Sequence, residues 1–291
     1  MSETVFNNID PATMERIKQL RLIDDELMTV VFGGDKKATE LLIRILLNRN
    51  DLKVTKSMTQ EQKHNLFGRS VTLDIVAEDI FMNEYNIEIQ RADKGDIEKR
   101  IRYHQAMIDS HTLKKQEEFG KLPNLYIIFI LEHDLYGKDV PIYYVRKILN
   151  VNDEEGNPLL FNDGCNIMYV NGEYKGEDAL GKLMHDFSTP NADEMYYKEL
   201  AEKVRFYKQD ETGVQMASKI VEEYGDERAA QALQQGIQQG IQQGALQQAI
   251  DSAKNMLRIG LGTHEQIAQA QNLPLKKVQE LAEEVAFEKN L

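Results

Sequence analysis

Residues 71–108 read VTLDIVAEDIFMNEYNIEIQRADKGDIEKRIRYHQAMI, and this stretch decides the fold. Apolar residues at positions 71, 73, 75 and 77 alternate with mostly polar ones, which is the period of a half-buried strand. Residues 87–90 (IEIQ) alternate in the same way. Apolar residues at 97, 101, 107 and 108 then follow helical spacing. We therefore predict a strand, a tight turn, a second strand and a long helix.

Polar side chains gather on one face of this predicted hairpin. Glu88 and Gln90 lie two residues apart on a strand and so share a face. Asp74 joins them only if the two strands pair in the right register, which an odd-length loop around residues 80–82, or a bulge, provides. Two carboxylates from adjacent strands suit a hard cation such as Mg²⁺, which takes one or two carboxylates and keeps several waters.

A family resemblance emerges at these residues. Asp74 and the segment 88–90 resemble the D…(D/E)-x-K core of the PD-(D/E)XK nucleases, in an E-x-Q form. The text NIEIQR (residues 86–91), followed by KRIRY (residues 99–103), is similar to the recombination-promoting nuclease (Rpn) or transposase branch of that superfamily. The resemblance implies an α/β, restriction-endonuclease-like fold, in which helices flank a mixed sheet, here followed by a helical C-terminal tail.

The resemblance also implies a function: a DNA endonuclease that hydrolyses phosphodiester bonds in DNA recombination, with Mg²⁺ as cofactor and Mn²⁺ as the alternative. Asp74, Glu88 and Gln90 are then the catalytic residues. The metal ligands are Asp74, Glu88 and the carbonyl of Ile89. The parent motif has lysine where this chain has Gln90, which can orient a water but carries no charge. A lysine placed there is expected to keep or raise activity.

A second interpretation stays open, in which the chain is a catalytically weak or inactive module. It would keep the nuclease fold, bind DNA or a protein, and assemble through its C-terminal helices. Divalent-dependent cleavage that is lost in Asp74→Ala separates the two interpretations. An active transposase would need strand transfer as well as cleavage, and no residue pattern in the chain indicates it.

Four arginines close to the predicted site are expected to contact DNA: Arg69, Arg91, Arg100 and Arg102. The formal net charge of −13 counts against a nucleic-acid partner at first sight. Residues 150–199 hold much of the excess acid, with 3 Lys and Arg against 11 Asp and Glu, and this segment lies away from the predicted site. A solvated helix face is the other interpretation of the basic residues after the site.

Several further residues are weighed as ligands. Some members of the superfamily add an acidic residue from the first helix, and Asp25, Glu26 and Glu40 are the candidates, with surface or capping roles as the alternative. The six histidines show no ligand spacing, which argues against a zinc site. His104 is placed off the buried side of the predicted helix.

The remaining pattern completes an α/β domain. Residues 124–131 (NLYIIFIL) are apolar on both faces, as in a central strand covered on both sides. We predict further strands at 141–145 and 165–170, a strand and a loop within 51–69, and helices within 22–48 and 176–224. Strand, helix, strand order after a hairpin predicts a mixed sheet.

The C-terminal part begins with a tetrapeptide repeat at 233–248 (LQQGIQQGIQQGALQQ). Four residues advance ~40° past a helical turn, so Ile237 and Ile241 stay near one face. Each glycine costs roughly 1 kcal/mol relative to alanine in a helix. A linker and a helix that needs a partner are therefore both compatible with the repeat.

Residues 253–287 read as a helix-turn-helix whose second helix is rich in glutamate, so packing or self-association is favoured over reading DNA. We predict a nuclease-like domain at 1–225, the repeat at 226–250 and a small helical unit at 251–291. Homo-oligomerisation is expected to run through this C-terminal region.

The cellular context follows from composition. No apolar run approaches the ~18 residues of a membrane helix, and the first 20 residues lack the pattern of a signal peptide. The single cysteine, Cys165, fits a reducing compartment. We expect a cytoplasmic protein with no membrane partner.

Overall fold

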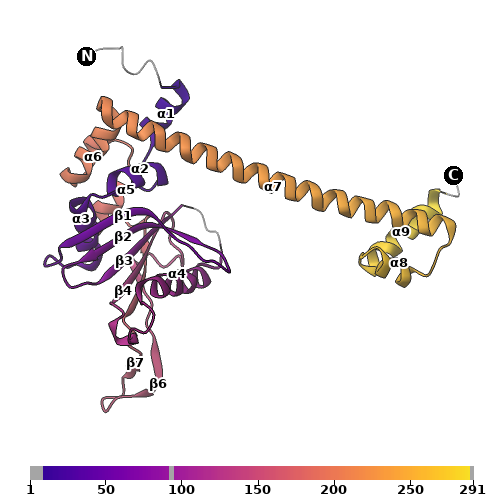
Figure 1. Cartoon of the computed structure of the whole chain (residues 1–291), viewed down its shortest axis with the longest axis horizontal. Coiled ribbons are helices and arrows are strands. Elements are labelled where there is room, and N and C mark those ends of the chain that lie inside the picture. The colour runs from indigo at the N-terminus through magenta and orange to yellow at the C-terminus, as the bar shows by residue number, and fades with distance from the viewer. Residues whose placement is uncertain (1–8, 92–94, 289–291) are drawn as a thin grey trace. The chain divides into compact units, whose positions relative to one another are not determined.

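A mixed sheet forms the centre of the larger part of the molecule. The computed structural model describes residues 9–91 and 95–288. Among these, six strands pair in the order β1-β2-β3-β4-β8-β5 (Figure 1). β3, β4 and β8 run parallel, and the outer pairs are antiparallel. Their bounds are β1 (Val54–Lys63), β2 (Val71–Asp79), β3 (Glu84–Gln90), β4 (Leu125–Leu131), β5 (Ile142–Tyr144) and β8 (Cys165–Asn171).

Helices cover both faces of this sheet, so the predicted restriction-endonuclease-like fold is confirmed. Helix α4 packs on one face of the sheet. The opposite face shares a core with helices that come before and after the strands in the chain. The helices are α1 (Pro11–Gln19), α2 (Asp25–Phe32), α3 (Lys36–Leu47), α4 (Ile97–Thr112), α5 (Ala179–Ser188) and α6 (Lys198–Gln209). Two short 3₁₀ turns also occur: η2 (Phe119–Lys121) lies between α4 and β4, and η3 (Ala192–Glu194) lies between α5 and α6.

Strand β4 shows why the sheet needs helices on both sides. Ile128 and Ile130 contribute to the core on one face, whereas Ile127 and Phe129 contribute to the core beneath α4. All four side chains are fully buried. A strand that is apolar at every position must be covered twice, and this confirms the prediction of a central strand.

The loop between β2 and β3 fixes how these strands pair. Ile75 lies opposite Ile87, and Glu78 lies opposite Glu84. The N–H of Asp79 donates to the carbonyl of Asn83, so the pairing continues to the loop itself. Three residues, 80–82, remain to make the turn. The loop is thus odd in length, as the predicted register requires.

Asp79 stabilises this turn from inside. Its carboxylate accepts hydrogen bonds from the main-chain N–H groups of Phe81 and Asn83. The Asn83 amide and the Tyr85 hydroxyl donate to the same carboxylate at 2.8 and 2.7 Å. Burial by itself raises the pKa of Asp79, but these hydrogen bonds outweigh it and hold that pKa below its ordinary value.

A small hairpin stands apart from the main sheet and has no counterpart among the predicted strands. β6 (Ile148–Asn152) pairs with β7 (Pro158–Leu160) in a separate two-stranded sheet, which extends away from the main sheet (Figure 1). The side chains of both strands are exposed. Strands this short carry too little alternation to be recognised from sequence.

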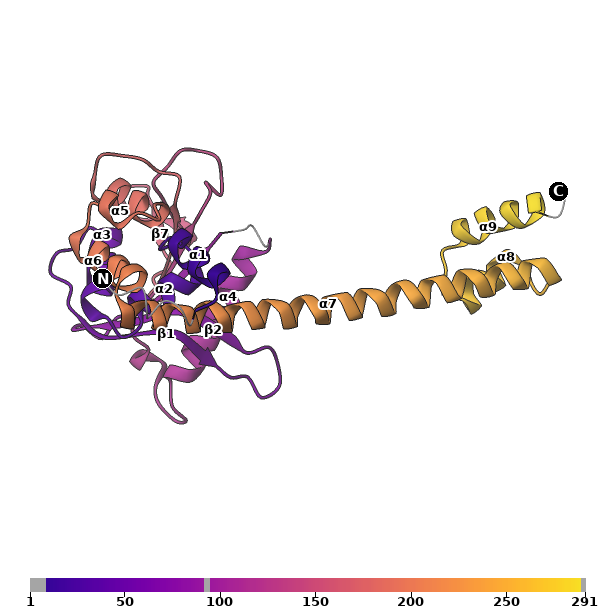
Figure 2. The same ribbon diagram turned by 90° about the horizontal axis from the view of Figure 1, so that it is seen from above.

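The chain divides into two compact units, residues 1–223 and 224–291. The glutamine–glycine repeat lies within a continuous helix, α7 (Glu211–Ile259). Helices α8 (His264–Ala270) and α9 (Leu275–Glu288) lie beside the C-terminal end of α7 (Figures 1 and 2). The three helices α7, α8 and α9 share a small apolar core, which consists of Ala253, Ile267, Ala268, Leu273, Val278 and Leu281. Thr263 and Gln266 form a capping box at the start of α8.

In the part of the chain that the structure describes, no helix is both long enough and apolar enough to span a membrane.

Candidate metal centre and active site

The predicted catalytic residues meet where β2 and β3 separate. The backbone ladder between the two strands ends at the Ile75–Ile87 pair. Beyond it, side chains take over the hydrogen bonds. The N–H of Ile89 donates to Asp74 Oδ2 at 2.9 Å, and the N–H of Asp74 approaches Glu88 Oε1 at 3.4 Å. The two carboxylates therefore lie side by side in the gap between the strands.

Gln90 joins this group through an arginine from α4. Arg100 Nη2 donates to Glu88 Oε2 at 3.0 Å, and Arg100 Nη1 donates to Gln90 Oε1 at 2.9 Å. Glu88 is 0% exposed, whereas the Arg100 side chain is 34% exposed. The structure thus brings Asp74, Glu88 and Gln90 together and adds Arg100, which sequence reasoning had assigned only to phosphate contacts.

His104 also belongs to this neighbourhood, and its predicted place on α4 was wrong. It is 4% exposed, and its Nδ1 lies 3.5 Å from Glu88 Oε1. Its ring packs against Phe129 at 6.4 Å between centroids. His104 lies three residues after Ile101 and four before Ile108, so it falls on the same face of α4. The face that meets the sheet therefore includes more than the aliphatic residues.

The electrostatics of Asp74 are unusual. Removal from water raises the pKa of the Asp74 carboxyl well above its ordinary value, and the negative charges of Glu88 and Asp25 raise it further. The N–H of Ile89 and the guanidinium of Arg100 act in the opposite direction without outweighing these effects. With both carboxylates ionised, the site would therefore carry more negative charge than Arg100 balances.

This donor set fits a hard divalent cation. Two adjacent carboxylates repel each other, and a cation between them relieves that repulsion. With the Ile89 carbonyl as predicted third donor, all ligands would be oxygens, which Mg²⁺ prefers. Within residues 9–91 and 95–288, no cluster of three or more His, Cys, Asp or Glu side chains is arranged to hold a metal. An ion bound at Asp74 and Glu88 would therefore keep waters in its shell, as Mg²⁺ does.

The three acidic residues weighed as further metal ligands, Asp25, Glu26 and Glu40, have different surroundings in the structure. Glu26 and Glu40 each form an ion pair with an arginine, at 3.1 and 2.8 Å. Asp25, the first residue of α2, is close enough to Asp74 for its charge to raise the pKa there. Asp25 is therefore the one of the three that acts on the site.

Arg91, predicted to contact DNA, is held in an ion-pair network at the end of β3. Its Nη1 lies 2.8 Å from Asp24 Oδ1 and its Nε lies 3.3 Å from Glu132 Oε2. Arg21 contacts the same two acids, at 3.4 and 2.8 Å. Because Arg91 is still 45% exposed, a phosphate contact would have to share it with these carboxylates.

The other two arginines predicted to bind DNA are exposed. Arg102 lies on α4, two residues beyond Arg100, and Arg69 precedes β2. The carbonyl of Arg69 accepts a hydrogen bond from the Tyr103 hydroxyl, which ties the start of β2 to α4. Both guanidinium groups remain candidates for contacts with a nucleic-acid backbone.

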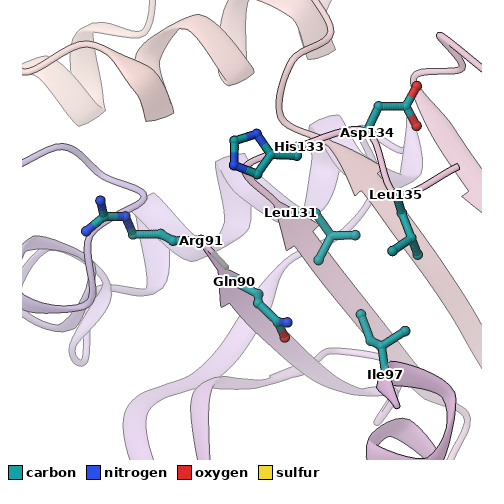
Figure 3. A pocket seen from close by; sticks show the side chains of 7 residues that line it. All are labelled: Gln90, Arg91, Ile97, Leu131, His133, Asp134 and Leu135. Carbon is teal, nitrogen blue, oxygen red and sulfur yellow. The ribbon is translucent and has the colours of Figure 1, made fainter. Parts of the chain in front are cut away.

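A pocket of about 140 Å³ adjoins the site at the C-terminal ends of β3 and β4. The side chains of Gln90, Ile97, Leu131 and Leu135 point toward one common space, whereas Arg91 points away from it (Figure 3). Clefts at the carboxyl ends of parallel strands commonly receive ligands. Gln90 belongs to this pocket and to the carboxylate group, so a ligand in the pocket would lie next to the candidate metal centre.

Comparison with known families agrees with this geometry. A family model described as PD-(D/E)XK nuclease family transposase matches residues 28–174. This range contains the whole main sheet and α4, and with them Asp74, Glu88, Gln90, Arg100 and His104, but not Asp25. Comparisons with curated proteins and with solved structures give no match. Since the match spans half of the chain and the fold is of the expected class, the chain belongs to the PD-(D/E)XK nuclease family transposases.

Proposed function

We propose that this chain is a divalent-metal-dependent endonuclease that hydrolyses phosphodiester bonds in DNA. One observation carries the proposal: the Asp74 and Glu88 carboxylates lie together where β2 and β3 separate, and the pKa of Asp74 is raised. A strongly perturbed acid beside a second acid is typical of functional sites. Membership of a nuclease family supports the same reaction class.

Each residue has a distinct part in the proposed reaction. In hydrolysis, a water oxygen bonds to phosphorus, the bond to the leaving sugar oxygen breaks, and the protons of the water pass to that oxygen and to solvent. Asp74 and Glu88 would hold the ion, with the Ile89 carbonyl as a further ligand. A bound divalent ion lowers the pKa of its water and polarises a phosphoryl oxygen. Gln90 would orient the attacking water through its amide.

The test is nicking of supercoiled DNA with Mg²⁺ or with Mn²⁺, both of which suit oxygen ligands. Asp74→Asn and Glu88→Gln keep the shape of each side chain and remove its charge. We expect both to lose metal-dependent nicking. Glu78→Gln is the matched control, because Glu78 is another acidic residue of β2, four residues from Asp74. Undiminished nicking by either site variant would refute the assignment.

The second candidate function is a nuclease-fold module that binds DNA or a protein without efficient cleavage. Two features favour it: Gln90 in place of the lysine of the parent motif, and the guanidinium that already neutralises Glu88. Such a module would bind DNA with the same affinity in Asp74→Asn as in the wild type, and neither would nick it. Gel-shift and nicking assays on one set of samples distinguish the two functions.

We also propose that the chain self-associates through residues 224–291. Leu233, Ile237 and Ile241 recur at intervals of four near one side of α7, and each side chain is more than half exposed. Ile259 and Leu261 are also exposed beside the small C-terminal core. Exposed apolar rows of this kind mark association surfaces. A dimer would present two candidate metal centres to one duplex. We further propose that the protein acts in the cytoplasm and that its nuclease activity serves DNA recombination.

A further inference from the structure

The E-x-Q form of the motif lacks a cation that the parent D…(D/E)-x-K motif has. In the parent motif the lysine follows the acid by two residues and supplies positive charge beside the reacting phosphate. Gln90 stands at that position and is neutral. Yet the Gln90 amide oxygen accepts a hydrogen bond from Arg100 Nη1 at 2.9 Å. A positive charge is therefore present next to position 90, although it comes from a different element.

Arg100 is held in place by more than one contact. Its Nη2 donates to Glu88 Oε2 at 3.0 Å, so one guanidinium edge spans the acid and the amide of the motif. The guanidinium carbon also lies 5.7 Å from the centroid of the Phe129 ring. Contact with an aromatic face favours a cation and limits its movement. Arg100 lies in the first turn of α4, where its N–H donates to the carbonyl of Asp96.

We propose that Arg100 supplies the positive charge that lysine supplies in the parent motif. This inference rests on the nuclease function proposed above and assigns to Arg100 the stabilisation of the charge that develops on the scissile phosphate. A guanidinium has five N–H donors, of which Glu88 and Gln90 take one each. The side chain is 34% exposed, so its remaining donors can reach a phosphate, which a planar guanidinium binds in bidentate fashion.

Gln90 then has a second task, which is to hold Arg100. Its amide oxygen accepts from the guanidinium, whereas a lysine at the same position would place an ammonium against it. Two adjacent cations disfavour each other. Gln90→Lys alone is therefore expected to weaken activity, which reverses the expectation drawn from the motif. Combined with Arg100→Met, the same lysine returns one cation to the site.

The test compares four full-length proteins: the wild type, Arg100→Met, Gln90→Lys, and the double variant. Two quantities are measured for each, the affinity for Mn²⁺ by calorimetry and the nicking rate at saturating Mn²⁺. Arg205→Met is the control for charge, because Arg205 pairs with the exposed Asp193 on another face. Thermal unfolding verifies that every protein is folded at the assay temperature.

We expect Arg100→Met to bind Mn²⁺ at least as tightly as the wild type, because the guanidinium no longer competes for Glu88. Its nicking rate should nevertheless fall about 10²–10³-fold, as when one donor is lost at a developing charge. The double variant should recover at least about tenfold of that loss. A residue that serves only as a structural counter-ion would instead leave the rate at saturating metal unchanged.

The outcomes separate this inference from the proposed function. A wild-type protein that binds Mn²⁺ but never nicks DNA refutes the nuclease function and the role of Arg100 with it. A wild-type protein that nicks DNA beside an equally active Arg100→Met variant refutes only the role of Arg100. A double variant no faster than Arg100→Met shows that charge at position 90 cannot replace the guanidinium, and overturns the proposed equivalence.

Discussion

Asp74→Asn should make the metal-free protein more stable at neutral pH. The carboxylate of Asp74 is removed from water and faces the charges of Glu88 and Asp25, which together raise its pKa. Asparagine keeps an oxygen to accept the hydrogen bond from Ile89, 2.9 Å away in the wild type, and its amide can donate to Glu88. Stabilising single substitutions commonly contribute about 0.5–2 kcal/mol, and we expect a gain of this size.

The size of the effect can be converted to a melting temperature. For a unit of 150–250 residues, 1 kcal/mol shifts the midpoint by about 2–4 °C, so we expect a rise of about 1–8 °C. Thermal unfolding followed by circular dichroism in EDTA measures it. Glu78→Gln, on the same strand, is the control for loss of one negative charge.

The pH dependence has a definite sign. Below the ordinary pKa of an aspartate, Asp74 is protonated in the folded and the unfolded chain, and the two proteins should melt together. As pH rises toward the raised folded pKa, the unfolded chain releases its proton while the folded chain keeps it, so the wild type loses stability. The advantage of Asp74→Asn should therefore grow between about pH 4 and the folded pKa, and then stay constant.

Addition of a divalent ion should make the wild type more stable than Asp74→Asn. A ligand at 100 times its Kd stabilises the folded state by about 2.7 kcal/mol, and only the wild type keeps both carboxylates. A wild type at least as stable as Asp74→Asn throughout pH 4–8 in EDTA would refute the reasoning, since the two carboxylates would then not oppose each other.

Three further variants test other parts of the molecule. Asp79→Ala deletes the acceptor of four hydrogen bonds in the β2–β3 turn, and urea titration should show a loss of about 3 kcal/mol; an unchanged midpoint would contradict this. Lys208 Nζ donates to three main-chain carbonyls, so Lys208→Met should cost about 2 kcal/mol, and equal stability would show that solvent replaces those contacts. Ile237→Gln combined with Ile241→Gln should lower the mass measured by light scattering relative to Gln239→Ala; an unchanged mass would place self-association elsewhere.

Local periodicity was enough to predict the central elements. The alternation in residues 71–77 and 87–90 and the doubly apolar strand at 124–131 indicate a hairpin and a central strand, which are the β2, β3 and β4 of the structure. The odd-length loop decides which face Asp74 occupies, and loop length is visible in the sequence. These features are local, so a single sequence contains them.

Contacts between distant segments could not be predicted in the same way. Arg100 lies 12 residues after Glu88, and Arg91 pairs with Asp24 from an earlier part of the chain and with Glu132, 41 residues after it. Charge alone predicts that an exposed arginine meets a phosphate, whereas the fold decides which carboxylate it reaches first. The fold family indicates which part of the chain contains the site, but it does not specify which charged residues pair there.

The glutamine–glycine repeat illustrates a different limit. Each glycine is unfavourable in a helix, and the repeat alone would be a poor nucleus. In the structure it is the middle of α7, with better helix formers on both sides. A segment that only has to extend an existing helix avoids the cost of nucleation. Propensity summed over the repeat therefore underestimates its helicity.

The three-residue connection after Asp79 makes the geometry of the candidate site depend on whether the loop has an odd or an even number of residues. Because neighbouring side chains on a strand face opposite ways, one residue inserted among positions 80–82 would shift the pairing of β2 by one step and turn Asp74 away from Glu88. Two inserted residues would keep both carboxylates on the same face. Length variation in this connection should therefore be tolerated in steps of two, with single insertions accepted only where a bulge absorbs the extra residue. A turn outside the candidate site would in this way constrain how the sequence around that site can change.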